Sequence, residues 1–416
     1  GSLSPVGPRA DVCFCEFCVD ALSELMRAEY GDLAALNASW STSFRDWGEV
    51  RPIVLEDALQ TGQITRWIDH RRNMDRVWTD AMQAKIDVVR RHDPNAQAVA
   101  DNFRVPTSFS GVDYWQLVSE VVGGSGTSYL REFSAPERSH LTWLRYSYWG
   151  MPTMSPGDHL FRRRIGRYVW EGLLNGLHGS SYWTTLWAAT PHEPWFRNPV
   201  APDLRTTEEG RWSMDPVAHI RTGIDRLVFD SEFDDSGVAI LYSRSSEHAA
   251  TAWQAIHGDS PAAGMTPDYG APLLRPFTDA LSALGYGHRV VSEQQVADGF
   301  LSEEGIRLLI LPFAQAIDVE TAAAIREYVG GGGLVLADIR PAVADRHGHT
   351  GGSGLLDDVF GVTHEADWHA YRPVEADLAL SGEAQALTIR DVRMPIIAGP
   401  AVTPGGAQSM GAVSDI

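Results

Sequence analysis

Apolar side chains recur at helical spacing in four segments along the first part of the chain. Residues 19–36 place apolar side chains on one face, and Gly31 is expected to close this helix as a glycine C-cap. Residues 62–92 carry the longest such pattern, which ends in a turn sequence containing Asp93 and Pro94. Two further helices are predicted over 157–178 and 215–229.

Short apolar runs between these helices predict β-strands. The four runs cover residues 96–103, 117–122, 141–149 and 179–187. The segment from Leu33 through Trp40, Phe44 and Trp47 has no such pattern and is expected to be an aromatic loop. Because strands and helices alternate, this part of the chain is predicted to form a parallel α/β sheet or barrel.

From Gly237 onward the alternation restarts with shorter elements. Strands are predicted over 238–242, 288–292, 306–311 and 334–338, and helices over 272–284 and 318–328. The run Gly330–Gly333 follows a helix, so it is better explained as a C-cap and turn than as a phosphate loop. This pattern predicts a doubly wound, flavodoxin-like domain. The tail from residue 362 is predicted to begin a small β unit.

The tryptophans indicate that the two halves are different domains. The chain of 416 residues has 14 tryptophans, and all but Trp253 and Trp368 lie before residue 213. A hydrophobic fraction of 44% and a charged fraction of 21% are typical of a globular protein. The net charge of −20 argues against general binding to nucleic acid, because a phosphate backbone would be repelled. The chain contains no run of 18 apolar residues, so the sequence predicts no membrane-spanning helix.

All three cysteines lie in one short motif, Cys13-Phe-Cys15-Glu-Phe-Cys18. An odd number of cysteines this close together cannot form a disulfide framework. Closely spaced thiolates can converge on one soft metal ion such as zinc, although three ligands leave a tetrahedral site one short. The alternative is a reduced cysteine cluster without metal.

The order of these motifs resembles glycoside hydrolase family 42, the β-galactosidases. The resemblance is carried by the cysteine motif, by Tyr30-Gly-Asp-Leu-Ala-Ala-Leu-Asn-Ala-Ser-Trp40 and by Phe44-Arg-Asp-Trp47. Residues 100–103 are similar to the fifth barrel strand of the family, and residues 179–184 to the eighth. The resemblance implies a (β/α)8 barrel followed by a trimerisation domain that matches residues 237–361.

The resemblance also implies a domain organisation and a site that the chain holds only in part. Residues 1–232 would be the C-terminal half of the barrel, 233–362 a flavodoxin-like trimerisation domain and 363–416 the start of a β unit. The acid/base glutamate and the fourth metal ligand of the family would lie upstream of Gly1, so these 416 residues alone are expected to be inactive. The family likeness further implies a retaining enzyme, a cytoplasmic homotrimer and a structural zinc ion.

The nucleophile is not evident in the sequence. Glycoside hydrolysis requires two carboxyl groups, and the family nucleophile ends the seventh strand. The matching residues 141–150 contain no carboxylate, and the nearest are Glu132, Glu137 and Asp158. Each of these is equally explained as a surface acid or, for Asp158, as an acid in the first turn of a helix.

Three residues at predicted strand ends are candidates for sugar contacts. Asn102 can hydrogen-bond a hydroxyl group, or can be an ordinary turn asparagine. Trp149 and Trp183 offer flat apolar faces that can stack on a pyranose ring, or can pack in a core.

Three functions from different classes follow. The first is part of a retaining glycoside hydrolase acting on β-galactosides or related oligosaccharides. The second is a carbohydrate-binding or scaffold protein that has lost its nucleophile, and the third is a nucleotide- or flavin-binding protein that uses the second domain. That domain also resembles class I glutamine amidotransferases, but thiol catalysis there is excluded because no cysteine follows Cys18.

Overall fold

A computed structural model describes the chain in separate stretches that divide into two units. It describes residues 13–96, 99–100, 123–125, 143–147, 159–174, 179–183, 200, 204–231, 236–256, 271–338, 340–364, 373–375, 378–380, 395–397, 403–404 and 411–413. The β1–β4 unit comprises Gly1–Pro5, Asp75–Ser236 and Thr278–Val290, and the β5–β8 unit comprises Val6–Met74, Gly237–Phe277 and Val291–Ile416.

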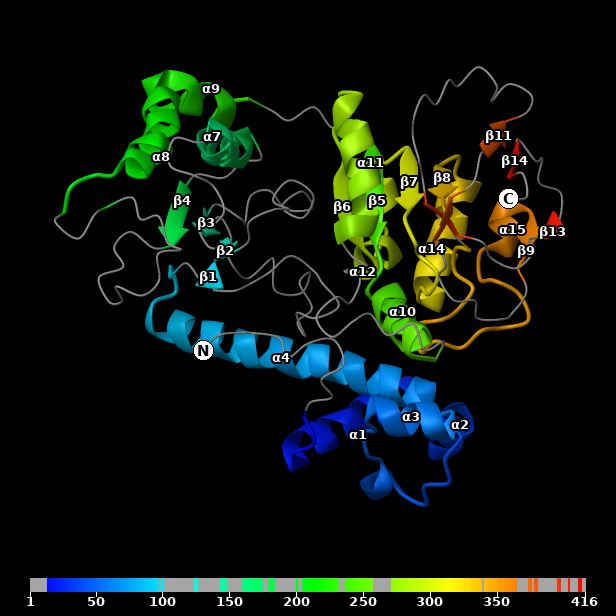
Figure 1. The fold of residues 1–416 in the computed structure, drawn as a ribbon. Coiled ribbons are helices and arrows are strands. Elements are labelled where there is room, and N and C mark those ends of the chain that lie inside the picture. The colour runs from blue at the N-terminus through cyan, green and yellow to red at the C-terminus, as the bar shows by residue number, and fades with distance from the viewer. Residues whose placement is uncertain are drawn as a thin grey trace. The chain divides into compact units, whose positions relative to one another are not determined.

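The described part of the chain begins with a helical segment, shown in blue in Figure 1. It consists of α1 (Glu16–Tyr30), α2 (Leu33–Trp40), a 3-10 turn η1 (Trp47–Glu49), α3 (Leu55–Thr61) and α4 (Ile64–His92). The helix expected to end at Gly31 is confirmed as α1, and Gly31 adopts a φ of 74° that favours glycine. The long helix expected over 62–92 is confirmed as α4.

The prediction of a loop from Leu33 onward is wrong for its first eight residues, Leu33–Trp40, which form α2. The Asp32 carboxylate accepts the Ala35 N–H at 2.7 Å and so satisfies a donor at the start of this helix. Leu36 and Trp40, one turn apart, are fully buried in a cluster with Leu22 and Met26 of α1. Tertiary packing and the N-cap therefore stabilise a helix that is too short to show its pattern in the sequence.

The β1–β4 unit contains a parallel sheet in which the strands follow their order in the chain. The strands are β1 (Val99–Ala100), β2 (Gly123–Ser125), β3 (Trp143–Ser147) and β4 (Gly179–Trp183), and every neighbouring pair is parallel. β3, β4 and the intervening α7 (His159–Leu174) confirm the strand–helix–strand prediction for this region. β2 begins just after the strand predicted at 117–122, which lies outside the described residues.

The helix expected from residue 215 begins earlier and is interrupted. It starts as α8 (Glu208–His219), capped by the Thr207 hydroxyl, which accepts the Gly210 N–H at 3.1 Å. A π-helical turn, η2 (Ile220–Ile224), and α9 (Asp225–Phe229) follow. Apolar residues of α7, α8 and η2 share one core that includes Val169, Leu173 and Ile220.

The β5–β8 unit contains a second four-stranded sheet with the order β6-β5-β7-β8 (Figure 1). The strands are β5 (Val238–Tyr242), β6 (Arg289–Ser292), β7 (Leu308–Leu311) and β8 (Leu334–Ala337). The β5–β7 and β7–β8 pairs are parallel. The helices between them are α10 (Arg244–Ile256), α11 (Ala271–Ala283), α12 (Glu293–Ala297), α13 (Phe300–Glu303) and α14 (Val319–Gly330).

Besides the cluster of α1 and α2, two apolar clusters of described residues lie within this unit. One is the core of the sheet, with Leu241, Leu309 and Leu311 packed against Ile325 of α14. The other joins Trp67 and Ile68 of α4 to Ala249, Ala252 and Trp253 of α10. The helical segment up to Met74 therefore shares a core with α10, although more than 150 residues separate them in the chain.

The described residues from 362 onward form short β-strands, as the sequence predicted. After α15 (Asp357–Phe360) come β9 (Val362–Thr363), β10 (Pro373–Glu375), β11 (Leu378–Leu380), β12 (Pro395–Ile397), β13 (Thr403–Pro404) and β14 (Gly411–Val413). They pair antiparallel as β9–β13, β10–β12 and β11–β14. Among the helices that the structure describes, none has the length and apolarity needed to cross a membrane.

The turn after α14 offers a test of the core of the second sheet. A Cβ atom added at Gly333 would lie 2.2 Å from Cζ of the buried Tyr328 ring, whereas one added at Gly330 would meet no atom within 4 Å. We expect Gly333→Ala to lower the free energy of unfolding by about 1–3 kcal/mol through overpacking. Gly330→Ala, the matched control, should leave it unchanged or raise it by up to about 1 kcal/mol. Urea denaturation measures both, and equal stabilities would contradict the packing described.

Candidate functional site

The three cysteines are brought together at the start of α1. Cys15 is the N-cap residue, Cys18 lies in the first turn and Cys13 precedes the helix. Their Sγ atoms all lie within 4.8 Å of one another. The Cys15 N–H points to the Cys13 sulfur at 3.5 Å, and the Cys13 N–H is donated to Met74 Sδ at 2.8 Å. The local sequence thus produces the thiol cluster that the spacing predicts.

The cysteines differ in their environments. The pKa of Cys15 is lowered by hydrogen bonds from the Cys18 backbone and from the Cys13 side chain. The pKa of Cys18 is raised to about 12, chiefly because its side chain is buried. A metal that binds all three thiolates must displace the proton from Cys18, so its affinity depends on pH.

The cluster fits a tetrahedral thiolate site in chemistry and in spacing. Zinc–sulfur bonds of about 2.3 Å place neighbouring sulfurs about 3.8 Å apart, which is compatible with the spacing found. Within the described part of the chain, no histidine, aspartate, glutamate or further cysteine joins the three as a fourth ligand.

The residues predicted to contact sugar or to catalyse fall mostly beyond what the structure describes. Asn102, Glu132, Glu137, Trp149 and Asp158 lie outside the described residues. Trp183 is the last residue of β4, and only its backbone is described. The strand predicted over 179–187 thus ends at Trp183, and the roles of all six residues stay predictions.

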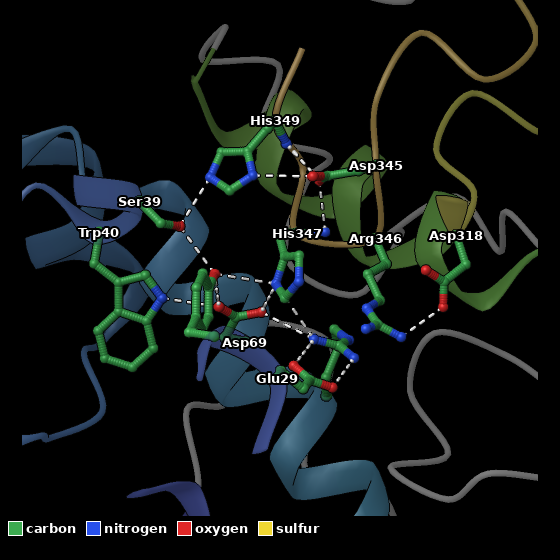
Figure 2. A network of polar contacts seen from close by, with 11 residues as sticks. Glu29, Ser39, Trp40, Asp69, Asp318, Asp345, Arg346, His347 and His349 are labelled. Carbon is green, nitrogen blue, oxygen red and sulfur yellow. Dashed lines mark hydrogen bonds and ion pairs between the residues drawn. The ribbon is translucent and has the colours of Figure 1, made fainter. Parts of the chain in front are cut away.

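A buried carboxylate that the sequence did not indicate lies at the centre of a polar network in the β5–β8 unit (Figure 2). Asp69, on α4, is fully buried. Its Oδ2 accepts hydrogen bonds from the Tyr30 hydroxyl and from Trp40 Nε1, both at 2.8 Å. Its Oδ1 accepts from Arg72 at 3.1 Å and lies 2.7 Å from Nδ1 of His347.

These contacts keep Asp69 ionised although it is buried. Burial alone would raise its pKa, but the charge and hydrogen bond of His347, with the charge of Arg72, lower it to about 2. Arg72 is shared with Glu29, whose two oxygens accept from the guanidinium at 2.7 and 2.9 Å. Such bidentate pairs are among the stronger polar contacts in proteins.

The loop after β8 holds His347 by a second set of contacts. The Asp345 carboxylate accepts the backbone N–H groups of His347 and His349, both at 2.9 Å. It also lies 3.1 Å from Nδ1 of His349, and this hydrogen bond is the main reason that the pKa of His349 is raised. Nε2 of His349 lies 2.9 Å from the Ser39 hydroxyl, which joins the loop to α2.

Glu29, Asp69 and His347 offer ligand atoms close enough together for one metal ion. The Arg72 guanidinium already contacts both carboxylates, at 2.7 Å for Glu29 and 3.1 Å for Asp69. A cation at the same point would be repelled by this arginine. We therefore interpret the cluster as a structural ion-pair network and not as a metal centre.

The sequence and the fold of the chain are both similar to those of known β-galactosidases. Residues 6–158 match the model of glycoside hydrolase family 42, described as "Beta-galactosidase". A β-galactosidase of Thermus thermophilus is 25% identical over 276 residues, which cover 53% of this chain and 40% of that protein. The resemblance inferred from the cysteine motif and the Tyr30–Trp47 region is confirmed.

Solved structures show the same α/β fold. The β-galactosidase of the haloarchaeon Halorubrum lacusprofundi superposes with a TM-score of 0.70 at 17% identity, over 96% of this chain and 60% of that one. The enzyme from Rahnella sp. R3 superposes with a TM-score of 0.69 at 17% identity, over 97% and 61%. The chain therefore spans about 40% of the curated relative and about 60% of these solved ones.

Replacing Asp69 tests whether the network stabilises the fold. The pKa of Asp69 is 3.8 when unperturbed and about 2 in the folded protein, so its contribution is present above pH 3.8 and is lost as the pH falls through 2. This shift of the Asp69 pKa corresponds to about 2 kcal/mol of the free energy of unfolding. Removing one partner of a buried ion pair costs about 3–5 kcal/mol. Asp69→Asn should therefore lower the free energy of unfolding by about 3 kcal/mol at neutral pH.

The pH profile distinguishes this effect from general damage. The difference between wild type and Asp69→Asn should shrink as the pH falls from 3.8 towards 2, because Asp69 takes up a proton in the unfolded chain in this range and in the folded protein only near pH 2. Asp80→Asn, at an exposed position on the same helix, is the control and should cost little at any pH. A difference that does not depend on pH would contradict the assignment of a buried ionised carboxylate.

Proposed function

We propose that this chain is part of a retaining glycoside hydrolase that cleaves β-galactosides or related oligosaccharides. The observation that supports it best is the family match over residues 6–158, because the motifs that carry it fold into one connected structure. The cysteine motif begins α1, while Tyr30 and Trp40 both donate to Asp69. The similarity to a β-galactosidase of Thermus thermophilus adds to this support.

The division of the chain supports a finer proposal about its domains. We infer that β1–β4 with α7 and α8 form the C-terminal half of a (β/α)8 barrel, since the strands are parallel and follow chain order. The β6-β5-β7-β8 order suits a flavodoxin-like domain, to which the family likeness assigns trimerisation. A cytoplasmic homotrimer is the corresponding proposal for the assembly.

The proposed chemistry needs one carboxyl group to protonate the departing oxygen and a second to attack the sugar. Because active sites of such barrels lie at the carboxyl ends of the strands, residues at or just after the ends of β1, β3 and β4 are the candidates to meet the sugar. Asn102, Trp149 and Trp183 have such positions in the sequence. Glu132, Glu137 and Asp158 are the acids nearest the proposed seventh strand.

Hydrolysis of 4-nitrophenyl β-galactoside tests the proposal directly. The chain, expressed with whatever coding sequence adjoins it in the genome, should release nitrophenol, and proton NMR should show the β-anomer forming first. Replacing the true nucleophile among Glu132→Gln, Glu137→Gln and Asp158→Asn should lower kcat by at least about 10²–10⁴-fold. Glu208→Gln, at an exposed position at the start of α8, is the control. No turnover on any aryl glycoside would refute the enzyme, and retained sugar binding would then favour a scaffold.

We propose that Cys13, Cys15 and Cys18 bind a structural zinc ion. Zinc would supply a closed cross-link between the start of α1 and the residues before it, and no reaction step passes through it. The close approach of the three sulfurs and the lowered pKa of Cys15 support this proposal.

The metal content of the purified protein tests the proposed zinc site. Elemental analysis of the purified protein should find zinc, and Cys15→Ser should remove most of it, because a hydroxyl is a poor replacement for a thiolate ligand. Ser23→Ala, on the same helix and outside the cysteine motif, should leave the zinc content unchanged. Equal zinc in wild type and Cys15→Ser would overturn the site.

A further inference from the structure

Three loops of the second sheet meet around the side chain of Glu293. Ser243 follows β5, Glu293 follows β6, and Ala316 and Asp318 lie in the loop after β7. In a parallel sheet the carboxyl ends of neighbouring strands face the same edge, so these loops lie together. The strand order β6-β5-β7-β8 has its topological switch point between β5 and β7, because the chain runs outward from β5 to β6 on one side and through β7 to β8 on the other. Open α/β sheets bind their ligands at such a switch point.

The Glu293 carboxylate accepts four hydrogen bonds at this point. Oε1 accepts from the Ser243 hydroxyl at 3.0 Å and from the Ser245 N–H at 3.1 Å. Oε2 accepts from the Ser245 hydroxyl at 3.1 Å and from the Asp318 N–H at 2.9 Å. All four donors are neutral groups, and Glu293 forms no ion pair in the part of the chain that the structure describes.

Two of these donors, the backbone N–H groups of Ser245 and Asp318, lie at the starts of helices longer than three turns. Ser245 is the second residue of α10, which has 13 residues, and Asp318 is the N-cap of α14, which has 12. Backbone N–H groups at a helix start are unpaired within the helix and carry partial positive charge, which favours an anion. The carboxylate of Glu293 thus contacts two helix starts at once, as a bound phosphate does in other α/β proteins.

The donors are held in place by contacts that do not involve Glu293. The Ser246 N–H is donated to the Ser243 hydroxyl at 3.0 Å. The Ser246 hydroxyl donates to the Ala316 carbonyl at 2.7 Å and accepts the Ala316 N–H at 2.9 Å. The loops after β5 and β7 are therefore joined directly, and we expect the donors to keep their arrangement when the carboxylate is removed.

Burial raises the pKa of Glu293 above its ordinary value, and the hydrogen bonds from Ser245, Asp318 and Ser243 offset only part of this rise. The residue is only partly buried, so a small anion from solvent can reach the same donors once the side chain is shortened.

We propose that Glu293 is a built-in anion that occupies the place where α/β sheets of this strand order bind the phosphate of a ligand. The anion site is formed by the Ser243, Ser245 and Asp318 donors, and the chain fills it with its own carboxylate. The second domain in its present sequence therefore does not bind a nucleotide or flavin phosphate at this edge. This inference is independent of the proposed glycosidase activity.

Removing the carboxylate from the 416-residue chain opens the site to small anions. In Glu293→Ala, acetate and inorganic phosphate should each raise the melting temperature in a saturable way, at constant ionic strength set with chloride. Calorimetric titration with phosphate should show one site per chain in Glu293→Ala and none in the wild type. Glu327→Ala, at an exposed position on α14, is the matched control and should respond to neither anion.

A second pair of variants separates the site from a general effect of salt. Adding Ser245→Ala to Glu293→Ala removes a hydroxyl donor and should weaken phosphate binding several-fold or more. Glu293→Gln keeps the size of the side chain but turns an NH₂ group towards the donors, so it should be less stable than the wild type and show no anion response. The proposal is overturned if folded Glu293→Ala binds neither anion, if the wild type binds phosphate at these donors, or if Glu293→Gln is as stable as the wild type.

Discussion

One buried charge, the carboxylate of Asp69, constrains how the β5–β8 unit is assembled. An ionised carboxylate without access to water costs several kcal/mol unless donors surround it. The donors come from four different segments: Tyr30 of α1, Trp40 of α2, Arg72 of α4 and His347 of the loop after β8. The charge is therefore compensated only when all four segments are in place.

This constraint gives a physical meaning to the motif that carries the family resemblance. Tyr30 and Trp40, which begin and end that motif, have their polar atoms on the same oxygen of Asp69. Their rings pack in the cluster formed by α1 and α2, so each residue supplies apolar area on one side and a donor on the other. The cysteines lie at the start of α1, and Glu29 and Tyr30 lie at its end. The polar network therefore holds the end of α1 opposite the candidate zinc site.

Periodicity in the sequence predicted the elements whose buried face repeats over many residues. The helices α1, α4, α7 and α14 and the strands of the second sheet belong to this group, and the cysteine cluster could be predicted because its three residues are neighbours in the chain. The network could not, because Asp69 and His347 are 278 residues apart, and the polar run Asp69-His-Arg-Arg72 looks like a solvent-exposed turn of helix. Glu293 was missed for the same reason, since its donors Ser243, Ser245 and Asp318 lie 50, 48 and 25 residues away.

A double-mutant cycle between Asp69 and His347 tests most directly whether the buried carboxylate joins the helical segment to the second sheet. The free energies of unfolding of wild type, Asp69→Asn, His347→Gln and the double variant are compared at neutral pH by urea denaturation. Direct contact in one network predicts a coupling energy of about 1–3 kcal/mol, because either single change already removes the shared interaction. Additive effects, with a coupling below about 0.5 kcal/mol, would contradict the account.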